Sequence, residues 1–132
     1  MQEHTVGDLN AALAQATAYA ASKGAEAILT LASDLPLLTR DDVLALVGAL
    51  HAPPACVIAS DVKDIGTNSL AFAPLRLDLF RFGPHSLSAH VDAARSQGIE
   101  PVIVRRPGLA QDLDTPDDYR RLAMAFTMPF KS

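Results

Sequence analysis

The pattern of apolar positions predicts helices and strands in alternation along the chain. Apolar residues recur at helical spacing from Leu9 to Ala20, which predicts a helix over residues 8–23. The unbroken apolar run 27–32 is typical of a central parallel strand buried on both faces. Asp34 stands just past the carboxyl end of that strand, where a polar side chain can reach a ligand.

The same alternation continues to the end of the sequence. We expect helices from Thr39 to about Leu50 and over Ser86–Gln97, strands over Cys56–Ser60, Ser69–Ala73 and Pro101–Val104, and a last helix that begins at Thr115 and Pro116. In this last helix Thr115 is the predicted N-cap, and Pro116 takes the first helical position, which proline favours. Alternating strands and helices predict an α/β layered fold.

Length and composition indicate a single domain and exclude several classes of partner. The 132 residues are 49% hydrophobic, enough for one core, so we expect one domain over residues 1–132. The formal net charge is −4, and no run of Lys or Arg could neutralise a nucleic acid backbone. No apolar stretch is long enough for a membrane span. Cys56, the single cysteine, permits no internal disulfide and suits a protein of the reducing cytoplasm.

Acidic residues at two predicted strand ends indicate a metal site. Asp112 and Asp114 lie two apart in an extended segment, so their side chains point to the same side. Together with Asp34 they form a set of oxygen ligands suited to Mg²⁺, whose shell substrate phosphates would complete. Two alternatives remain open: Asp34 as a turn cap, and Asp114 as the start of the last helix.

The Asp112 to Thr115 segment also resembles the Asp-x-Asp motif of haloacid dehalogenase-type phosphatases. In that fold the motif follows the first strand, and the whole core comes after it. Here only 18 residues follow Asp114. Its position therefore argues against a phosphatase.

Two further segments indicate an anion-binding site. Gly66-Thr67-Asn68 lies between two predicted strands, and Phe82-Gly83-Pro84-His85-Ser86 leads into a predicted helix. Hydroxyls and the backbone N–H groups of a helix N-terminus bind anions, although ordinary turn and N-cap roles are alternatives. His85 and His90 are five apart, which is not the spacing of zinc ligands on a helix. We expect His85 to border the anion pocket and His90 to lie on the outer face of its helix.

Taken together, the order of these motifs resembles the guanylyltransferases of deazaflavin coenzyme (coenzyme F420) biosynthesis. The segments that carry the resemblance are 8–13, 32–39, 66–70, 81–86 and 107–118. Such enzymes transfer GMP from GTP to a small phosphorylated acid (2-phospholactate, phosphoenolpyruvate or 3-phosphoglycerate) and release pyrophosphate. The resemblance implies a three-layer, Rossmann-like fold of the nucleotide-diphospho-sugar-transferase type with a mostly parallel sheet.

The resemblance also assigns roles to residues of this sequence. It implies that Mg²⁺ is held by Asp34, Asp112 and Asp114, that the acceptor acid is bound by Thr67, Gly83 and Ser86, and that Asn10 lies near the nucleoside. Three positions depart from the family pattern, which usually has Ala at Ser33, Gly at His85 and Phe at Leu87. A histidine beside the acceptor pocket leaves the identity of the acceptor open.

The family's opening strand and its Lys-Ser-Arg-Leu-type loop, which wraps the triphosphate, have no counterpart in the sequence. We therefore expect an N-terminally incomplete fold in which strand 27–32 has an unpaired edge, covered by a second copy or another partner. Other nucleotidyltransferases of the molybdenum-cofactor (MobA-like) or sugar type, and a non-catalytic protein that binds a small acid, remain alternative functions.

Overall fold

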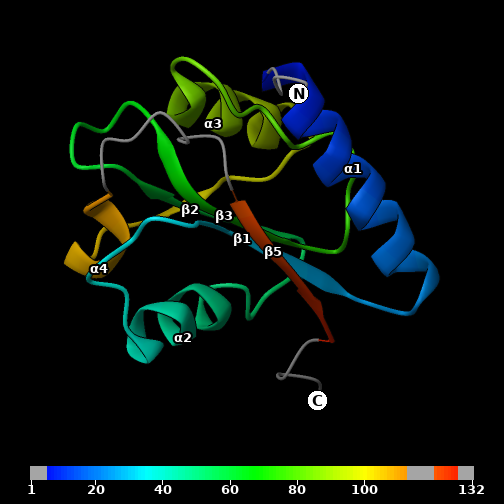
Figure 1. Ribbon diagram of the computed structural model, residues 1–132. Helices are drawn as coiled ribbons and strands as arrows, with labels where there is room; N and C mark the ends of the chain where they lie inside the picture. The colour runs from blue at the N-terminus through cyan, green and yellow to red at the C-terminus, as the bar shows by residue number, and fades with distance from the viewer. Residues whose placement is uncertain (1–5, 113–120, 128–132) are drawn as a thin grey trace, which may run out of the picture.

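Helices cover both faces of one five-stranded sheet (Figure 1). The computed structural model describes residues 6–112 and 121–127. Its elements are α1 (Val6–Ser22), β1 (Ala27–Ala32), α2 (Arg40–Gly48), β2 (Ala55–Ser60), β3 (Thr67–Ala73), α3 (Ser86–Ser96), β4 (Val102–Val104), α4 (Pro107–Ala110) and β5 (Arg121–Phe126). In Figure 1, α1 and α3 lie on one side of the sheet and α2 and α4 on the other. The predicted three-layer α/β arrangement is therefore confirmed, whereas the short helix α4 was not predicted.

The sheet is mixed, so the prediction of a mostly parallel sheet is wrong. The strand order is β4-β2-β3-β1-β5. Only β2 and β4 pair in parallel, while β3 is antiparallel to both β1 and β2, and β5 is antiparallel to β1. The connection from β2 to β3, residues 61–66, is too short for the crossover that parallel neighbours need. An unbroken apolar run indicates that a strand is buried on both faces, but it does not indicate whether the neighbouring strands are parallel or antiparallel.

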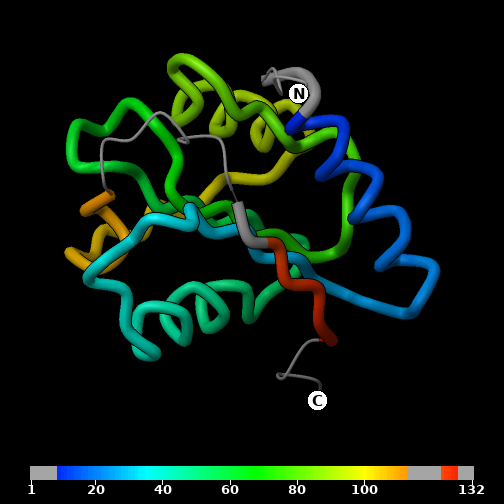
Figure 2. The backbone as a smooth tube through the Cα atoms, viewed as in Figure 1, coloured from blue at the N-terminus to red at the C-terminus, as the bar shows by residue number. Residues whose placement is uncertain are grey.

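Strand β1 pairs with β3 on one side and with β5 on the other, so the predicted unpaired edge is also wrong. β5 pairs with β1 along its whole length, from Ala27 opposite Phe126 to Ala32 opposite Arg121. Figure 2 shows these two segments, distant in sequence, running side by side. The expectation of a partner that covers the edge of β1 therefore loses its structural basis.

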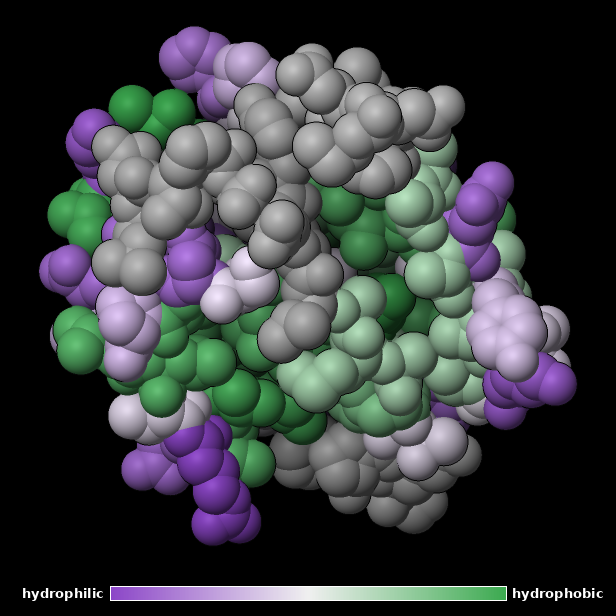
Figure 3. Space-filling view, in the orientation of Figure 1, coloured by the Kyte–Doolittle hydropathy of each residue, from purple (hydrophilic) through white to green (hydrophobic). Residues whose placement is uncertain are grey.

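The predicted last helix is not found where the structure can test it. Its expected start at Thr115 and Pro116 lies outside the described residues, and residues Arg121–Phe126 form β5 instead of a helix. β5 is an outer strand of the described sheet, and the side chain of Met124 on it is 43% exposed. In the view of Figure 3, which has the orientation of Figure 1, apolar side chains gather around the middle of the molecular surface.

Alternate side chains of the strands build two separate cores. Ile28 and Cys56 belong to the cluster beneath α1 and α3, whereas Leu29 and Val57 belong to the cluster against α2 and α4. Cys56 is 1% exposed, and this burial raises the pKa of its thiol to about 12, so the cysteine is a core residue. Within the described ranges, no helix combines the length and the apolar character needed to cross a bilayer.

A buried carboxylate joins α2 to α4. Thr39, the expected start of this helix, is its N-cap, and it forms a capping box with Asp42. The Arg106 Nε donates to Asp42 Oδ1 over 2.6 Å, and this hydrogen bond holds the pKa of Asp42 below its usual value. Gly108 allows the close approach, since a Cβ there would overlap Asp42 Oδ2 and lie 2.7 Å from the Leu37 carbonyl oxygen.

Gly108→Ala is expected to lower the free energy of unfolding by roughly 1–3 kcal/mol, because the methyl group must displace the buried carboxylate and a backbone carbonyl. Gly48→Ala is the matched control, since nothing lies within 4 Å of its Cβ position at the end of α2. It should raise stability by up to about 1 kcal/mol. Urea unfolding of both variants measures the difference, and equal stabilities would contradict the close packing of α4 on α2.

Candidate functional site

Most of the polar residues that were predicted as site residues lie together at one end of the strands. β1 and β2 run in the same direction because both are antiparallel to β3. Their carboxyl ends therefore lie beside the amino end of β3. Asp34 follows β1, Asp61 follows β2 directly, and Thr67 opens β3. A pocket of about 230 Å³ lies at this end of the strands.

Most of the predicted site residues border this single pocket. Its lining includes Asp34, Thr67, Gly83, Ser86 and Asp112, and also Asp61 and Asn68. These residues come from segments far apart in the sequence, which the fold brings together. Their assigned roles in binding stay predictions, and Asp114 lies outside the described residues.

Carboxylates form one side of the pocket. The Asp34 Oδ2 atom is buried and has no hydrogen-bond partner among the described residues. Partial burial raises the pKa of Asp112 above its ordinary value, and the negative charges of Asp34 and Asp61 add to this effect, while a hydrogen bond from Asn68 opposes it. An unsatisfied buried carboxylate oxygen beside two further carboxylates calls for a cation or a hydrogen-bond donor.

The donor set fits Mg²⁺ better than a metal held by protein ligands alone. In the part of the chain that the structure describes, no group of three or more His, Cys, Asp or Glu side chains is placed to hold a metal ion by itself. Mg²⁺ is usually bound by one or two carboxylates, with water and substrate phosphates as further ligands. Asp34 and Asp112 are the described residues best placed for this role, with Asp61 beside them.

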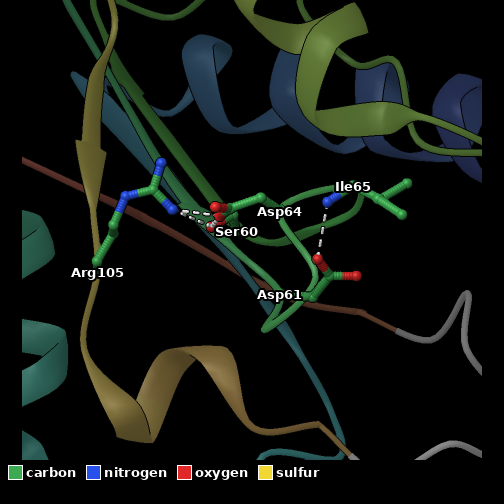
Figure 4. Close-up of polar contacts among 5 residues, drawn as sticks. All are labelled: Ser60, Asp61, Asp64, Ile65 and Arg105. Carbon is green, nitrogen blue, oxygen red and sulfur yellow. Dashed lines mark hydrogen bonds and ion pairs between the residues drawn. The ribbon is translucent and has the colours of Figure 1, made fainter.

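The turn that carries Asp61 is held from two sides (Figure 4). The Asp61 Oδ1 atom accepts a hydrogen bond from the Ile65 N–H over 3.0 Å. Arg105 forms an ion pair with Asp64, which also accepts a hydrogen bond from the Ser60 hydroxyl over 2.7 Å. Ser60 and then Arg105 lower the pKa of Asp64. These contacts fix the backbone that directs Asp61 into the pocket.

Two hydroxyl groups also line the pocket. Thr67 and Ser86 are 2% and 3% exposed, and the Ser86 hydroxyl donates to Thr67 Oγ1 over 3.2 Å. Ser86 is the first residue of α3, whose amino end carries partial positive charge. Hydroxyls at a helix N-terminus suit the anionic groups of a ligand.

Two asparagines hold the backbone around the pocket. The Asn68 Nδ2 donates to the carbonyl oxygens of Leu109 and Ala110, over 2.9 and 3.2 Å, just before Asp112. The Asn10 amide makes two hydrogen bonds with the backbone of Phe82, whose neighbour Gly83 lines the pocket. Asn10 itself is not among the lining residues, and its contact with a nucleoside stays a prediction.

Asp61 was not among the predicted site residues, and neither histidine lies where it was predicted. Asp61 directly follows the apolar run of β2, the same signal that identified Asp34. His90 is 1% exposed, so its predicted place on the outer helix face is wrong. His85 has a left-handed backbone (φ 56°) and lines a neighbouring hollow with Asp64 and Ile65, not the pocket itself.

Comparisons with known proteins identify relatives of this chain. A family described as "Guanylyl transferase CofC like" matches residues 1–126. The phosphoenolpyruvate guanylyltransferase of Rubrobacter xylanophilus is 41% identical over 114 residues, which cover 86% of this chain and 56% of that protein. The enzyme of the same name from Chloroflexus aggregans is 40% identical over 121 residues, 89% of this chain and 58% of that protein.

Another relative has a different name. The 2-phospho-L-lactate guanylyltransferase of Methanothermobacter thermautotrophicus is 34% identical over 118 residues, which cover 89% of this chain and 51% of that protein. The chain thus spans about half the length of the curated relatives it matches. On the extent of the family match and the identity to these enzymes, the chain belongs to the CofC-like guanylyl transferase family.

Proposed function

We propose that this chain takes part in transfer of GMP from GTP to a small phosphorylated acid, with release of pyrophosphate. The observation that carries the proposal is the pocket that three carboxylates line together with two buried hydroxyls, of which Ser86 is at the N-terminus of α3. The names of the relatives support guanylyl transfer and indicate phosphoenolpyruvate or 2-phospholactate as the acceptor, with 3-phosphoglycerate a further candidate. Guanylyl transfer to such acids would place the chain in coenzyme F420 biosynthesis, in the cytoplasm.

The reaction needs no nucleophilic side chain. An oxygen of the acceptor phosphate attacks the α-phosphorus of GTP, a new P–O bond forms, and the bond to the β-phosphate oxygen breaks. The acceptor is already an anion, so no base has to remove a proton. Catalysis of this kind rests on positioning and charge stabilisation.

The Thr67, Ser86 and His90 cluster is not a nucleophile with its base, although it contains hydroxyls and an imidazole. The Nε2 atom of His90 accepts a hydrogen bond from the Arg81 backbone N–H over 2.9 Å. In the neutral ring the other nitrogen, Nδ1, then carries the proton and has no lone pair to receive one from Thr67. The hydroxyls therefore serve binding and not covalent catalysis.

Different residues of the pocket would bind the acceptor acid and the metal ion. Thr67, Ser86 and the backbone at Gly83 would bind the anionic groups of the acceptor acid. Asp34 and Asp112, with Asp61 beside them and Asp114 by family resemblance, would hold Mg²⁺. When bound there, Mg²⁺ supplies neutralisation of the negative charge on the phosphates. Asn10, near the nucleoside by resemblance, keeps the Phe82 backbone in place.

Titration calorimetry with phosphoenolpyruvate, GTP and MgCl₂ in all combinations tests this function. We expect phosphoenolpyruvate to bind the chain, and Mg²⁺ to strengthen binding of phosphorylated ligands. If phosphoenolpyruvate and 2-phospholactate both fail to bind at millimolar concentrations, the assignment of the acceptor pocket is wrong. Binding of the acids with no effect of Mg²⁺ or GTP would favour a non-catalytic binding protein.

Asp34→Asn should abolish the effect of Mg²⁺ on phosphoenolpyruvate binding, because the amide keeps the size of the side chain but loses the charge that attracts the cation. Asp92→Asn is the matched control, since Asp92 lies on the exposed side of α3, outside the pocket. Calorimetric titrations with and without MgCl₂ give the comparison. An unchanged effect of Mg²⁺ in Asp34→Asn would remove this carboxylate from the metal site.

Thr67→Val and Ser86→Ala should each weaken phosphoenolpyruvate binding by roughly 1–3 kcal/mol, the usual value of a hydrogen bond to a charged group. Nucleotide affinity should change little, because the hydroxyls lie on the acceptor side. Dissociation constants for phosphoenolpyruvate and GTP measure this selectivity. Equal losses for both ligands would indicate a general folding defect and reduce Ser86 to a helix cap.

A further inference from the structure

A buried histidine that the proposed reaction does not use lies directly behind the hydroxyl side of the pocket. His90 is on α3 and is 1% exposed. Its ring packs edge-on against Phe82, with 4.7 Å between the ring centroids and 70° between the planes. Its Nδ1 atom lies 2.8 Å from Thr67 Oγ1. The ring therefore touches a residue of the pocket wall but does not line the pocket.

The hydrogen bonds of the ring fix where its proton resides. A backbone N–H can only donate, so the bond from Arg81 requires a lone pair on His90 Nε2. The neutral ring has one protonated nitrogen, which must then be Nδ1. His90 consequently donates to Thr67 Oγ1, and the Thr67 oxygen is the acceptor in this pair.

From this geometry we infer that His90 is a positioning residue that orients the Thr67 hydroxyl as a hydrogen-bond donor for the acceptor acid. Because the oxygen accepts from His90, the Thr67 proton cannot point at the imidazole. The proton points away from the imidazole, and an anion in the pocket that Thr67 lines can accept a hydrogen bond from it. The inference rests on the proposed function for the identity of the ligand.

The His90 ring also holds the backbone that leads to Gly83 of the pocket lining. By accepting from the Arg81 N–H, His90 holds the backbone that continues through Phe82 to Gly83. The side-chain amide of Asn10, on α1, also holds this backbone, because it makes hydrogen bonds with both the N–H and the carbonyl oxygen of Phe82. The two functions of His90, on Thr67 and on the backbone, can be separated because each uses a different ring nitrogen.

Two amide variants separate them. In His90→Asn the amide nitrogen takes the place of Nδ1, so it can donate to Thr67, but the acceptor for the Arg81 N–H is lost. In His90→Gln the amide oxygen takes the place of Nε2, so the backbone bond is kept, but the donor to Thr67 is lost. A merely structural histidine predicts similar affinity losses in both variants, since each loses one hydrogen bond.

With phosphoenolpyruvate as the calorimetric probe, we expect His90→Gln to weaken binding by about tenfold and His90→Asn by less than about threefold. Adding Thr67→Val to His90→Gln should cause little loss beyond that of Thr67→Val alone, because the two residues act as a unit. Thermal unfolding of each variant checks that it is folded. In ¹⁵N NMR of the free chain, the His90 imidazole should carry its proton on Nδ1, and Thr67→Val should shift that resonance.

Equal losses in the Gln and Asn variants, additive losses with Thr67→Val, or a proton on Nε2 would each overturn the role of His90 alone. Failure of the unmutated chain to bind both phosphoenolpyruvate and 2-phospholactate would overturn the proposed function, and the role of His90 with it, even if the proton is on Nδ1. The NMR result therefore distinguishes a wrong ligand from a wrong assignment of the hydrogen bonds.

Discussion

The antiparallel pairing of β1 with β3 is the constraint on which the pocket depends. Two fully buried hydroxyls hold its register, since Thr30 Oγ1 donates to the Leu70 carbonyl over 3.1 Å and Ser69 Oγ donates to the Thr30 carbonyl over 2.7 Å. A slip of one residue would reverse the faces of the strand and leave both hydroxyls unpaired, at about 1–3 kcal/mol each. In the native register the carboxyl end of β1 lies beside the amino end of β3, so Asp34 and Thr67 border one pocket.

The positions of most helices and strands could be predicted from the sequence, but the directions of the strands could not. The apolar run of β1 and the cap at Thr39 are local signals, and both elements form where they were expected. Strand direction depends on pairing between distant segments, which no local pattern records. β5 shows the same limit, because Leu, Ala and Met favour helices, and only pairing with β1 makes Arg121–Phe126 a strand.

Site residues at strand ends were predictable, whereas those that act through other residues were not. Asp34 and Asp112 follow local elements that can be recognised in the sequence. His90 lies on a buried stripe of α3 with Ser86, Ala93 and Ala94, at helical spacing. These four side chains are either small or polar, so hydropathy alone assigns them to the outer face of the helix. The burial of His90 depends on a backbone donor at Arg81 and a hydroxyl on β3, neither of which the sequence places near it.

Asp42 and Asp112 differ in whether neighbouring residues compensate the charge of the carboxylate. Asp42 is buried beside Arg106, its pKa is lowered, and its charge stabilises the contact between α2 and α4. Asp112 has its pKa raised by burial and by two like charges, so the described residues around it do not offset its charge. Among the described residues that line the pocket there is no Lys or Arg. Phosphate beside three carboxylates requires a compensating cation, and the raised pKa of Asp112 together with the unsatisfied oxygen of Asp34 marks where that cation would be most stabilising.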